Sequence, residues 1–432
     1  MKYFRGKLRG RIAKCISAIT RYSDACYQIC TRPEDEGELL NRIECSKKQK
    51  LDTLPQLEKS KERILLLLNG VFNFHLDIEG LLRELRPGLS RHVRLVVVAY
   101  NPYLRFLFSW AGALRLRSGE VPQTFLTRTD LNNVSRLAGF EVVRLKPTGS
   151  LLCMIPLVGN FLDALIGCIP LLKQFSLTYV IVLRPVIVDS EKPSLSIVIP
   201  ARNEKGNIED AVKRLKSAGV PCTEIVFVEG HSTDGTYEEI ERVMQSYSQI
   251  YPMKALKQSG KGKSDAVRLG FQHCTGELLT VLDADLTMPP ELLMRFYEAY
   301  SAGLADFING SRLLYPMEDQ AMRYLNRLGN VFFAKMLSTV LDAPIGDSLC
   351  GTKLFSRRDY ERFCSWRADF GEFDPYGDFE LIFPAAILAL GIVDVPIRYR
   401  ARTYGSTNIR RFADGFQLLK MTLIGFFKVK LT

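Results

Sequence analysis

The sequence lacks the paired cysteines that zinc sites and disulfide frameworks require. Its ten cysteines are scattered, and no two of them form a Cys-x-x-Cys motif or a zinc-binding spacing. Several lie within apolar runs, where a thiol packs as a small hydrophobic group. We therefore expect a reduced chain without structural disulfides, as is usual in the cytosol.

The sequence also has no recognisable secretory signal. The first fourteen residues contain six lysines and arginines and no acid, but no apolar segment follows them. Such a run predicts a solvated helix face, a basic amphipathic helix that touches a membrane, or an organellar transit peptide.

Long apolar runs are scarce, and only Leu151–Leu172 is long enough to cross a bilayer. Asp163 lies near the centre of this run, where a charge is costly in lipid. We therefore expect a lipid-facing or cleft-lining hairpin there. The segment Phe416–Thr432 is apolar but contains three lysines. It predicts a helix that lies in a membrane interface or packs on its domain.

Acidic residues are outnumbered, and the formal net charge is +11. A basic balance favours anionic partners. Aromatic residues do not alternate with the basic runs as they do on nucleic-acid-binding surfaces, so we expect no nucleic acid partner. Phosphorylated substrates and lipid headgroups remain. We expect a cytoplasmic chain that is peripheral to a membrane, at its cytosolic face.

The length of 432 residues suggests two or three domains, and no internal repeat or low-complexity tract is present. Two blocks of alternating strands and helices are visible, and their near-continuous apolar strands predict parallel, doubly wound α/β sheets. The expected organisation is an α/β domain over 1–188, a linker over 189–193, a second α/β domain over 194–411 and a C-terminal amphipathic helix over 412–432.

The expected elements of the first block are the strands Arg63–Leu68, Val93–Ala99, Glu141–Leu145 and Tyr179–Leu183 and the helices Asp77–Leu85 and Thr129–Ala138. Those of the second block are the strands Leu195–Ile199, Glu224–Val228, Leu278–Leu282 and Phe307–Asn309, with the helices Ile208–Ser217, Tyr237–Ser246, Ser264–Phe271 and Glu291–Tyr300.

Two carboxylates follow the apolar strand Leu278–Leu282 directly. In extended backbone, Asp283 and Asp285 turn to the same face of the chain. Together with the oxygens of a diphosphate, such a pair can hold one hard divalent cation. The Asp-x-Asp motif alone is weak evidence, because a turn uses the same residues.

Further polar clusters follow other strands of the second block. Because ligand sites of open α/β sheets lie at the carboxyl ends of strands, we expect these clusters to line one nucleotide crevice. The clusters are Pro200–Glu204, Glu229–Thr236, the basic turn Gly260–Lys263 and Asn309–Arg312.

With these motifs in order, the block from Ser194 to about Ile409 resembles a family 2 glycosyltransferase. It is most similar to the branch that acts on dolichyl or polyprenyl phosphate. The resemblance implies a GT-A fold, a UDP- or GDP-sugar donor, Mg²⁺ or Mn²⁺, and an inverting displacement at the anomeric carbon.

The same resemblance implies roles for individual residues. Arg202 stands where the family usually has a tyrosine that stacks on the nucleotide base of the donor. Gly230 replaces the second acid of the family's Asp-Asp-Gly-Ser segment, which recognises that base. These two departures leave the identity of the nucleotide base open. The implied donor-binding residues are Pro200, Asn203, Glu204, Glu229, Lys261, Lys263 and Arg312. The implied metal-binding residues are Asp283, Asp285 and Thr287, of which the two acids are also counted as catalytic.

Acceptor-side residues follow from later motifs. A hydroxyl acceptor needs a general base, for which Asp378 and Glu380 are the candidates, whereas a phosphate acceptor needs none. Glu380 could instead interact with the dipole of the following helix. Arg400, Arg402 and Ser406 resemble the family's terminal phosphate-binding segment. The bland alternative for the arginines is a solvated edge strand.

The first block resembles the carboxyl half of a class I S-adenosylmethionine methyltransferase, notably at Ala138–Val143 and at Asn101-Pro102. No Gly-x-Gly loop follows an early strand, so the block is expected to be a degenerate relic or a docking module.

Three hypotheses follow for the whole chain. The leading one is sugar transfer from a nucleotide sugar to a lipid-linked phosphate at a membrane surface. The second keeps this donor chemistry and replaces the acceptor with a hydroxyl of a soluble sugar or protein. The third is a non-catalytic scaffold.

Overall fold

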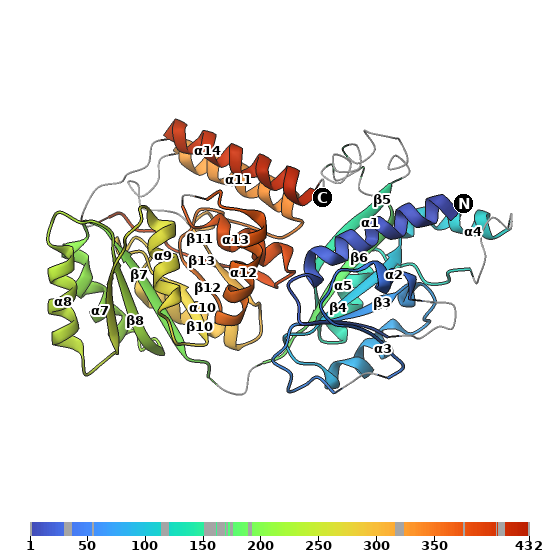
Figure 1. Cartoon of the computed structure of the whole chain (residues 1–432), viewed down its shortest axis with the longest axis horizontal. Helices are drawn as coiled ribbons and strands as arrows, with labels where there is room; N and C mark the ends of the chain where they lie inside the picture. The colour runs from blue at the N-terminus through green and yellow to red at the C-terminus, as the bar shows by residue number, and fades with distance from the viewer. Residues whose placement is uncertain are drawn as a thin grey trace. The chain divides into compact units, whose positions relative to one another are not determined.

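The computed structural model divides the chain into two compact units (Figure 1). The first comprises residues 1–187, 387–389 and 426–432, and the second comprises 188–386 and 390–425. The structure describes residues 2–29, 37–53, 56–113, 121–150, 161, 169, 172, 176–188, 192–315, 324–374, 376–402, 404 and 411–430.

The first unit is built on a six-stranded sheet with the order β2-β1-β3-β4-β6-β5. Its strands are β1 (Ala25–Ile29), β2 (Lys48–Leu51), β3 (Ile64–Asn69), β4 (Arg94–Tyr100), β5 (Phe140–Ser150) and β6 (Ser176–Pro185). The described helices of this unit are α1 (Lys2–Thr20), α2 (Glu38–Arg42), α3 (Ile78–Leu85), α4 (Arg105–Ala113) and α5 (Arg128–Leu137).

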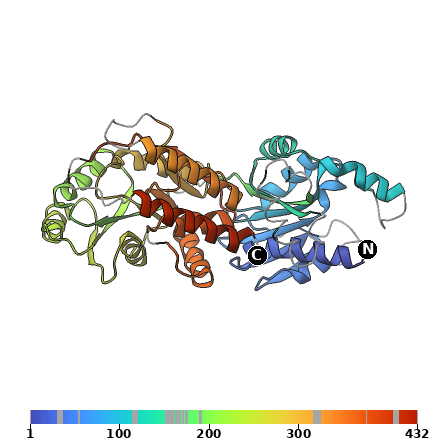
Figure 2. The same cartoon turned by 90° about the horizontal axis from the view of Figure 1, so that it is seen from above.

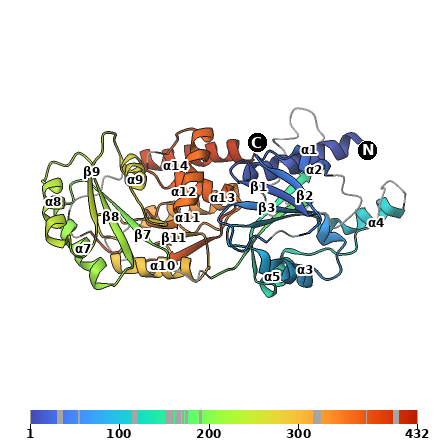
Figure 3. The same cartoon turned by 60° about the horizontal axis from the view of Figure 1, so that its bottom comes forward.

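Helices cover both faces of this sheet (Figure 3). Leu66 of β3 packs in one apolar cluster with Leu82 of α3 and Leu131 of α5. The next residue, Leu67, packs in another cluster with Ile16 of α1. Successive residues of a strand point to opposite faces, so a strand buried on both sides is apolar throughout.

The expected parallel arrangement of the first sheet is only partly correct. Strands β1 to β4 are parallel to their neighbours, but β6 is antiparallel to both β4 and β5. A continuous apolar run in the sequence of a strand indicates that both faces of the strand are buried. It does not indicate whether the strand is parallel or antiparallel to its neighbours. The helix expected over Thr129–Ala138 is α5, which begins one residue earlier, at Arg128, after a capping box formed by Thr127 and Asp130.

The second unit is built on a seven-stranded sheet with the order β13-β11-β12-β10-β7-β8-β9. Its strands are β7 (Leu195–Ala201), β8 (Cys222–Glu229), β9 (Met253–Lys257), β10 (Leu278–Val281), β11 (Phe307–Ser311), β12 (Lys353–Ser356) and β13 (Ile392–Pro396). The helices are α7 (Ile208–Ser217), α8 (Thr236–Tyr247), α9 (Lys263–Gln272), α10 (Leu293–Ser301), α11 (Tyr324–Leu341), α12 (Arg357–Phe370), α13 (Phe379–Ile387) and α14 (Arg411–Gly425).

The direction of the strands in the second sheet decides where the polar clusters meet. β7, β8, β9 and β10 are mutually parallel, so the segments that follow their carboxyl ends share one edge. Of the described strands in this second sheet, only β12 is antiparallel to its neighbours, which are β10 and β11. A core that includes Ile199, Phe227 and Phe296 holds the sheet against its helices.

The apolar segments that suggested membrane contact are only partly described. None of the described helices combines the length and the hydropathy needed to cross a bilayer. The run Leu151–Leu172 lies almost wholly outside the described residues, as does most of the linker 189–193. The C-terminal helix expected over 412–432 begins at Arg411, and its last turn over Phe426–Lys430 is π-helical.

Candidate active site

Asp283 and Asp285 lie in the tight turn that follows β10. The buried strand ends at Val281, and Leu286 adopts a left-handed backbone with φ of 52°. Asp285 Oδ1 accepts hydrogen bonds from the backbone N–H of Thr287 (3.1 Å) and from its hydroxyl (2.8 Å). The Thr287 hydroxyl therefore orients the carboxylate of Asp285.

Two cations compensate these two acids. Lys263 Nζ lies 2.5 Å from Asp283 Oδ1, and Arg402 Nη2 lies 2.6 Å from Asp285 Oδ2. Burial acts to lower the pKa of Lys263, but the charges of Asp283, Asp378 and Asp285 outweigh burial and raise it. Lys263 is therefore fully charged at neutral pH.

Arg402 also reaches the segment that follows β7. Its Nη1 atom lies 3.7 Å from Glu204 Oε1, so one guanidinium bridges Glu204 and Asp285. Burial raises the pKa of Glu204 to about 7; the hydrogen bond from Asn207 opposes the shift, and the charge of Asp285 adds to it. The carboxyl ends of β7 and β10 are thus joined by a single side chain.

The loops that follow β7 and β8 hold each other in place. Asn203 has a left-handed φ of 55°, its Oδ1 accepts the N–H of Thr233 (2.8 Å), and its own N–H donates to Ser232 Oγ (3.0 Å). Glu229 accepts a hydrogen bond from the N–H of Ser232. The expected donor-binding residues Asn203 and Glu229 therefore shape this edge of the site through loop contacts.

The two candidate bases are held by cations. Lys353 is fully buried on β12, and its Nζ lies 2.6 Å from Asp378 Oδ1. Glu380 forms ion pairs with Arg268 and Arg367. Both oxygens of Glu380 are occupied in this way, which leaves Asp378, close to Lys263, as the better placed of the two.

Arg312 is engaged by a neighbouring acid. Its guanidinium makes a two-pronged contact with Asp347, with Nε 2.7 Å and Nη2 2.9 Å from the carboxylate oxygens. The guanidinium carbon also lies 5.4 Å from the centre of the Tyr399 ring. The expected phosphate contact of Arg312 therefore competes with an existing ion pair.

The remaining expected residues lie at the margin of the site. Pro200 is the last residue but one of β7, and Lys261 is exposed in the turn before α9. Arg400 donates its backbone N–H to the carbonyl of Thr287 (2.9 Å). Arg400 and Arg402 follow β13 and lie outside any strand, so the edge-strand alternative is wrong. Ser406 lies outside the described residues.

The sequence interpretation assigned no individual role to four charged residues of this site, although the segment Asp347–Lys353 as a whole resembles the family's acceptor-side segment. Asp347 and Lys353 belong to the segment Asp347–Lys353, and their charges within an apolar setting could have indicated buried partners. Arg268 and Arg367 gave no local signal, because their partner Glu380 is distant in sequence. Cys350 in the same segment is buried, which raises the pKa of its thiol to about 12, as is usual for a cysteine that packs in the interior.

Comparison with known proteins classifies this part of the chain. Residues 196–363 match the family model described as glycosyl transferase family 2. This segment is a family 2 glycosyltransferase domain. The expected fold class is thereby confirmed, with a GT-A-type α/β domain in the second unit and a second α/β sheet in the first.

Relatives of the glycosyltransferase domain include enzymes with named substrates. The low-salt glycan biosynthesis hexosyltransferase Agl6 of Haloferax volcanii is 30% identical over 237 residues, which are 54% of this chain and 54% of that protein. The dolichol-phosphate mannosyltransferase of Pyrococcus furiosus is 38% identical over 120 residues, or 27% of this chain and 33% of that protein. The chain thus spans about half and a third of these curated relatives' lengths.

A solved structure is more distantly similar. Glucosyl-3-phosphoglycerate synthase from Mycobacterium tuberculosis, in complex with Mn²⁺ and UDP-glucose, is 16% identical with a TM-score of 0.40. The likeness covers 55% of this chain and 80% of that one.

The glycosyltransferase domain offers hard oxygen donors for a divalent cation. Within the described part of the chain, no three His, Cys, Asp or Glu side chains gather as a metal site. Asp283 and Asp285 nevertheless supply the carboxylates that Mg²⁺ and Mn²⁺ prefer, with further ligands left to phosphate and water. Gly351 lets the backbone come close here, since a Cβ on it would meet Lys263 Nζ and Asp283 Oδ2. The residues present therefore fit such an ion.

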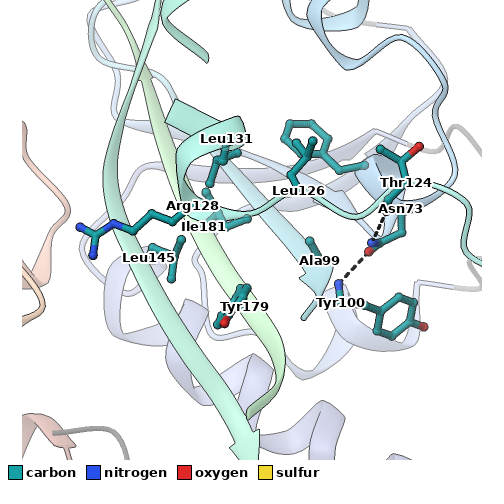
Figure 4. A pocket seen from close by; sticks show the side chains of 11 residues that line it. Asn73, Ala99, Tyr100, Thr124, Leu126, Arg128, Leu131, Leu145, Tyr179 and Ile181 are labelled. Atoms are coloured by element: carbon teal, nitrogen blue, oxygen red, sulfur yellow. Dashed lines mark hydrogen bonds between the residues drawn. The ribbon is translucent and has the colours of Figure 1, made fainter. Parts of the chain in front are cut away.

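A separate hollow lies in the first unit, outside the glycosyltransferase domain (Figure 4). The side chain of Asn73, which lines this hollow, is engaged within the protein. Asn73 Oδ1 accepts the N–H of Tyr100 (2.7 Å), and its amide group donates to the carbonyl of Thr124 (2.9 Å). The family match does not include this unit, and the methyltransferase likeness stays a prediction.

Proposed function

We propose that the chain is an inverting glycosyltransferase that moves a sugar from a UDP- or GDP-sugar to a polyprenyl or dolichyl phosphate at a membrane surface. The observation that carries this proposal is the bridge made by Arg402 between Glu204 and Asp285. Arg402 thereby connects the segment that we assign to the nucleotide base of the donor with the acids that we assign to the diphosphate of the donor.

In this proposal, Asp283 and Asp285 hold the divalent cation, which when bound neutralises charge on the diphosphate. Lys263 and Arg402, which pair with these two acids, would then be available to bind phosphate oxygens of the donor. A bidentate arginine contact suits a phosphate. Thr287 keeps the carboxylate of Asp285 oriented throughout. Asn203 keeps the two nucleotide-side loops together, and Glu229 holds the turn that follows β8.

The ion pairs of the two candidate general bases, Asp378 and Glu380, bear on the kind of acceptor. A hydroxyl acceptor must lose its proton to a base, whereas a lipid phosphate is already an anion. Glu380 is held by two arginines and Asp378 by Lys353, so both candidate bases are already engaged in ion pairs. This arrangement favours an anionic acceptor, and a dolichol-phosphate mannosyltransferase is among the relatives.

The test is a transfer assay across a panel of UDP- and GDP-sugars with Mn²⁺, with and without polyprenyl phosphate. Asp285→Asn is the site variant, and Asp210→Asn, at an exposed position on α7, is the matched control. We expect lipid-dependent turnover that the first variant loses and the second retains. Anomeric configuration of the product, read by NMR, tests inversion.

Two other results of this assay would change the proposed acceptor or contradict the proposed activity. Turnover that needs no lipid, but responds to a soluble sugar or protein, moves the acceptor to a hydroxyl and gives Asp378 the role of base. Asp378→Asn would then abolish transfer while donor binding persists. Absence of donor binding and turnover with every donor contradicts the enzyme and leaves a scaffold.

A further inference from the structure

Two neighbouring helices of the second unit expose large apolar side chains in regular rows. On α14, Phe416, Leu419 and Leu423 are 72%, 36% and 46% exposed. Their spacing of three and four residues places them on one face of the helix. On α11, Leu328 and Phe332 are 49% and 55% exposed at a spacing of four. Isolated exposed leucines are ordinary, but two such rows on adjacent helices are not.

The opposite faces of the same helices account for their packing on the domain. Leu418 and Met421 of α14 are buried, and a Cβ on Gly425 would lie 2.6 Å from the ring of Phe383. Leu337 of α11 is fully buried. α11 and α14 lie side by side in two views (Figures 1 and 2). The exposed rows are thus not needed to attach the helices to their own domain.

The charges beside these rows have one dominant sign. Arg327 and Lys335 on α11 and Lys420 on α14 are exposed. The sequence of α11 contains no Asp or Glu, and that of α14 contains only Asp414. Apolar side chains interleaved with lysine and arginine complement a surface that has an apolar interior and anionic headgroups.

We propose that the exposed face of α11 and α14 docks on an anionic lipid bilayer, with the two helices lying in the interface plane. Leu419, Leu423 and Phe332 enter the boundary between headgroups and acyl chains, and Arg327, Lys335 and Lys420 meet lipid phosphates. The role of this docking rests on the proposed function. Because α14 follows the segment that carries Arg402, docking would bring a lipid phosphate acceptor to the site.

The test measures binding of the full chain to phosphatidylcholine vesicles with and without phosphatidylglycerol, by flotation. We expect binding to the anionic vesicles and little to the neutral ones. The variant Leu419→Glu/Leu423→Glu should weaken binding by at least about tenfold, because it puts two charges into the apolar layer. Because both side chains are exposed, the substitutions leave the core untouched. Each of Arg327→Gln, Lys335→Gln and Lys420→Gln should weaken binding about fivefold.

Matched controls use the same substitutions elsewhere in the unit. Leu304 is 56% exposed, and Lys216 is exposed on α7. Leu304→Glu and Lys216→Gln should leave vesicle binding unchanged. Donor binding, measured by calorimetry without lipid, should be the same in all these variants, which separates failure of docking from failure of the proposed function.

Two results would overturn the inference. Vesicle binding that is equal in the wild type and in Leu419→Glu/Leu423→Glu would place the lipid contact elsewhere. A wild-type chain that ignores vesicles but forms a dimer that this variant dissociates would make the face a contact between two copies.

Discussion

At the scale of residues, the main feature is that Lys263 and Arg402 neutralise the acids assigned to the metal. Under the proposed function, Arg402→Gln removes a cation that would compete with Mn²⁺ for Asp285 and would also bind the diphosphate. We therefore expect Mn²⁺ to bind the nucleotide-free variant more tightly, while the nucleotide sugar binds about tenfold or more weakly, the scale of one charge-assisted hydrogen bond. Mn²⁺ paramagnetic resonance and titration calorimetry measure the two affinities.

The opposite signs of these effects distinguish this prediction from general damage to the site. Arg398→Gln, at an exposed arginine of the same segment, is the control and should change neither affinity. If both ligands bind Arg402→Gln more weakly, the arginine organises the site and is not a competitor of the metal.

A second residue-scale prediction concerns Glu204. Burial and the charge of Asp285 raise its pKa from 4.5 to about 7, against the hydrogen bond from Asn207. The folded state therefore favours the protonated form, so the associated stability is present below pH 4.5 and is lost as pH rises through 7. Glu204→Gln mimics the protonated form at every pH. Its melting temperature should rise relative to the wild type between pH 4.5 and 7.

Thermal melts of both proteins across this pH range measure the effect, without nucleotide or metal. Glu238→Gln, at a residue of the first turn of α8, controls for loss of a negative charge and should show no such trend. A melting difference that is constant from pH 4.5 to 7 would mean that Glu204 titrates normally.

The sequence predicts the acids of these ion pairs but not the cations that neutralise them. Asp283 and Asp285 could be placed because an apolar strand ends directly before them, and a strand end is a local signal. The partners of Asp378 and Glu380 could not, because Lys353 and Arg268 approach them only after β12 and α9 have packed. A lysine at the start of a short apolar run gives no indication of which acid will neutralise it.

At the scale of elements, the position of Lys263 depends on how closely α9 packs on the sheet. Gly270 of α9 faces β7, and a Cβ there would lie 2.4 Å from Val198 Cγ1 and 3.2 Å from Val228 Cγ2. Gly270→Ala forces the helix away from the strands. We expect a loss of about 1–3 kcal/mol in unfolding free energy, typical of overpacking, and weaker donor binding because Lys263 moves with α9.

Chemical denaturation and donor titration measure the two effects. Gly329 of α11 is the matched control, because nothing lies within 4 Å of a Cβ added there. Gly329→Ala should stabilise the protein by up to about 1 kcal/mol through helix propensity. If Gly270→Ala proves equally benign, then α9 tolerates displacement and Lys263 is not positioned by this packing.

The elements themselves were predicted unevenly. Long apolar strands such as β4, β7 and β8 were found within a residue or two, because burial on both faces leaves a continuous apolar signal. β2 was missed, since Lys48–Leu51 is a polar edge strand whose pattern resembles a loop. The antiparallel placement of β12 follows from its connections, which apolar periodicity does not encode.

At the scale of the whole molecule, the chain has separate apolar cores. One packs around β7, β8 and β10 and includes Leu215, Val243 and Phe296. Another packs around β3, β4 and β6 and includes Leu82 and Leu131. Each sheet is therefore stabilised mainly by its own helices. Units with cores of their own commonly unfold as separate cooperative transitions.

We expect differential scanning calorimetry to resolve two transitions, of which only one responds to the ligands of the glycosyltransferase domain. A ligand that binds the folded form at about one hundred times its dissociation constant stabilises it by about 2.7 kcal/mol. UDP or GDP with Mn²⁺ should therefore raise the transition of the second unit and leave the other unchanged, and Asp285→Asn should abolish the shift. A single transition that moves as a whole would show that the two cores unfold together. In that case the stability of the first unit would be part of what keeps the donor site assembled.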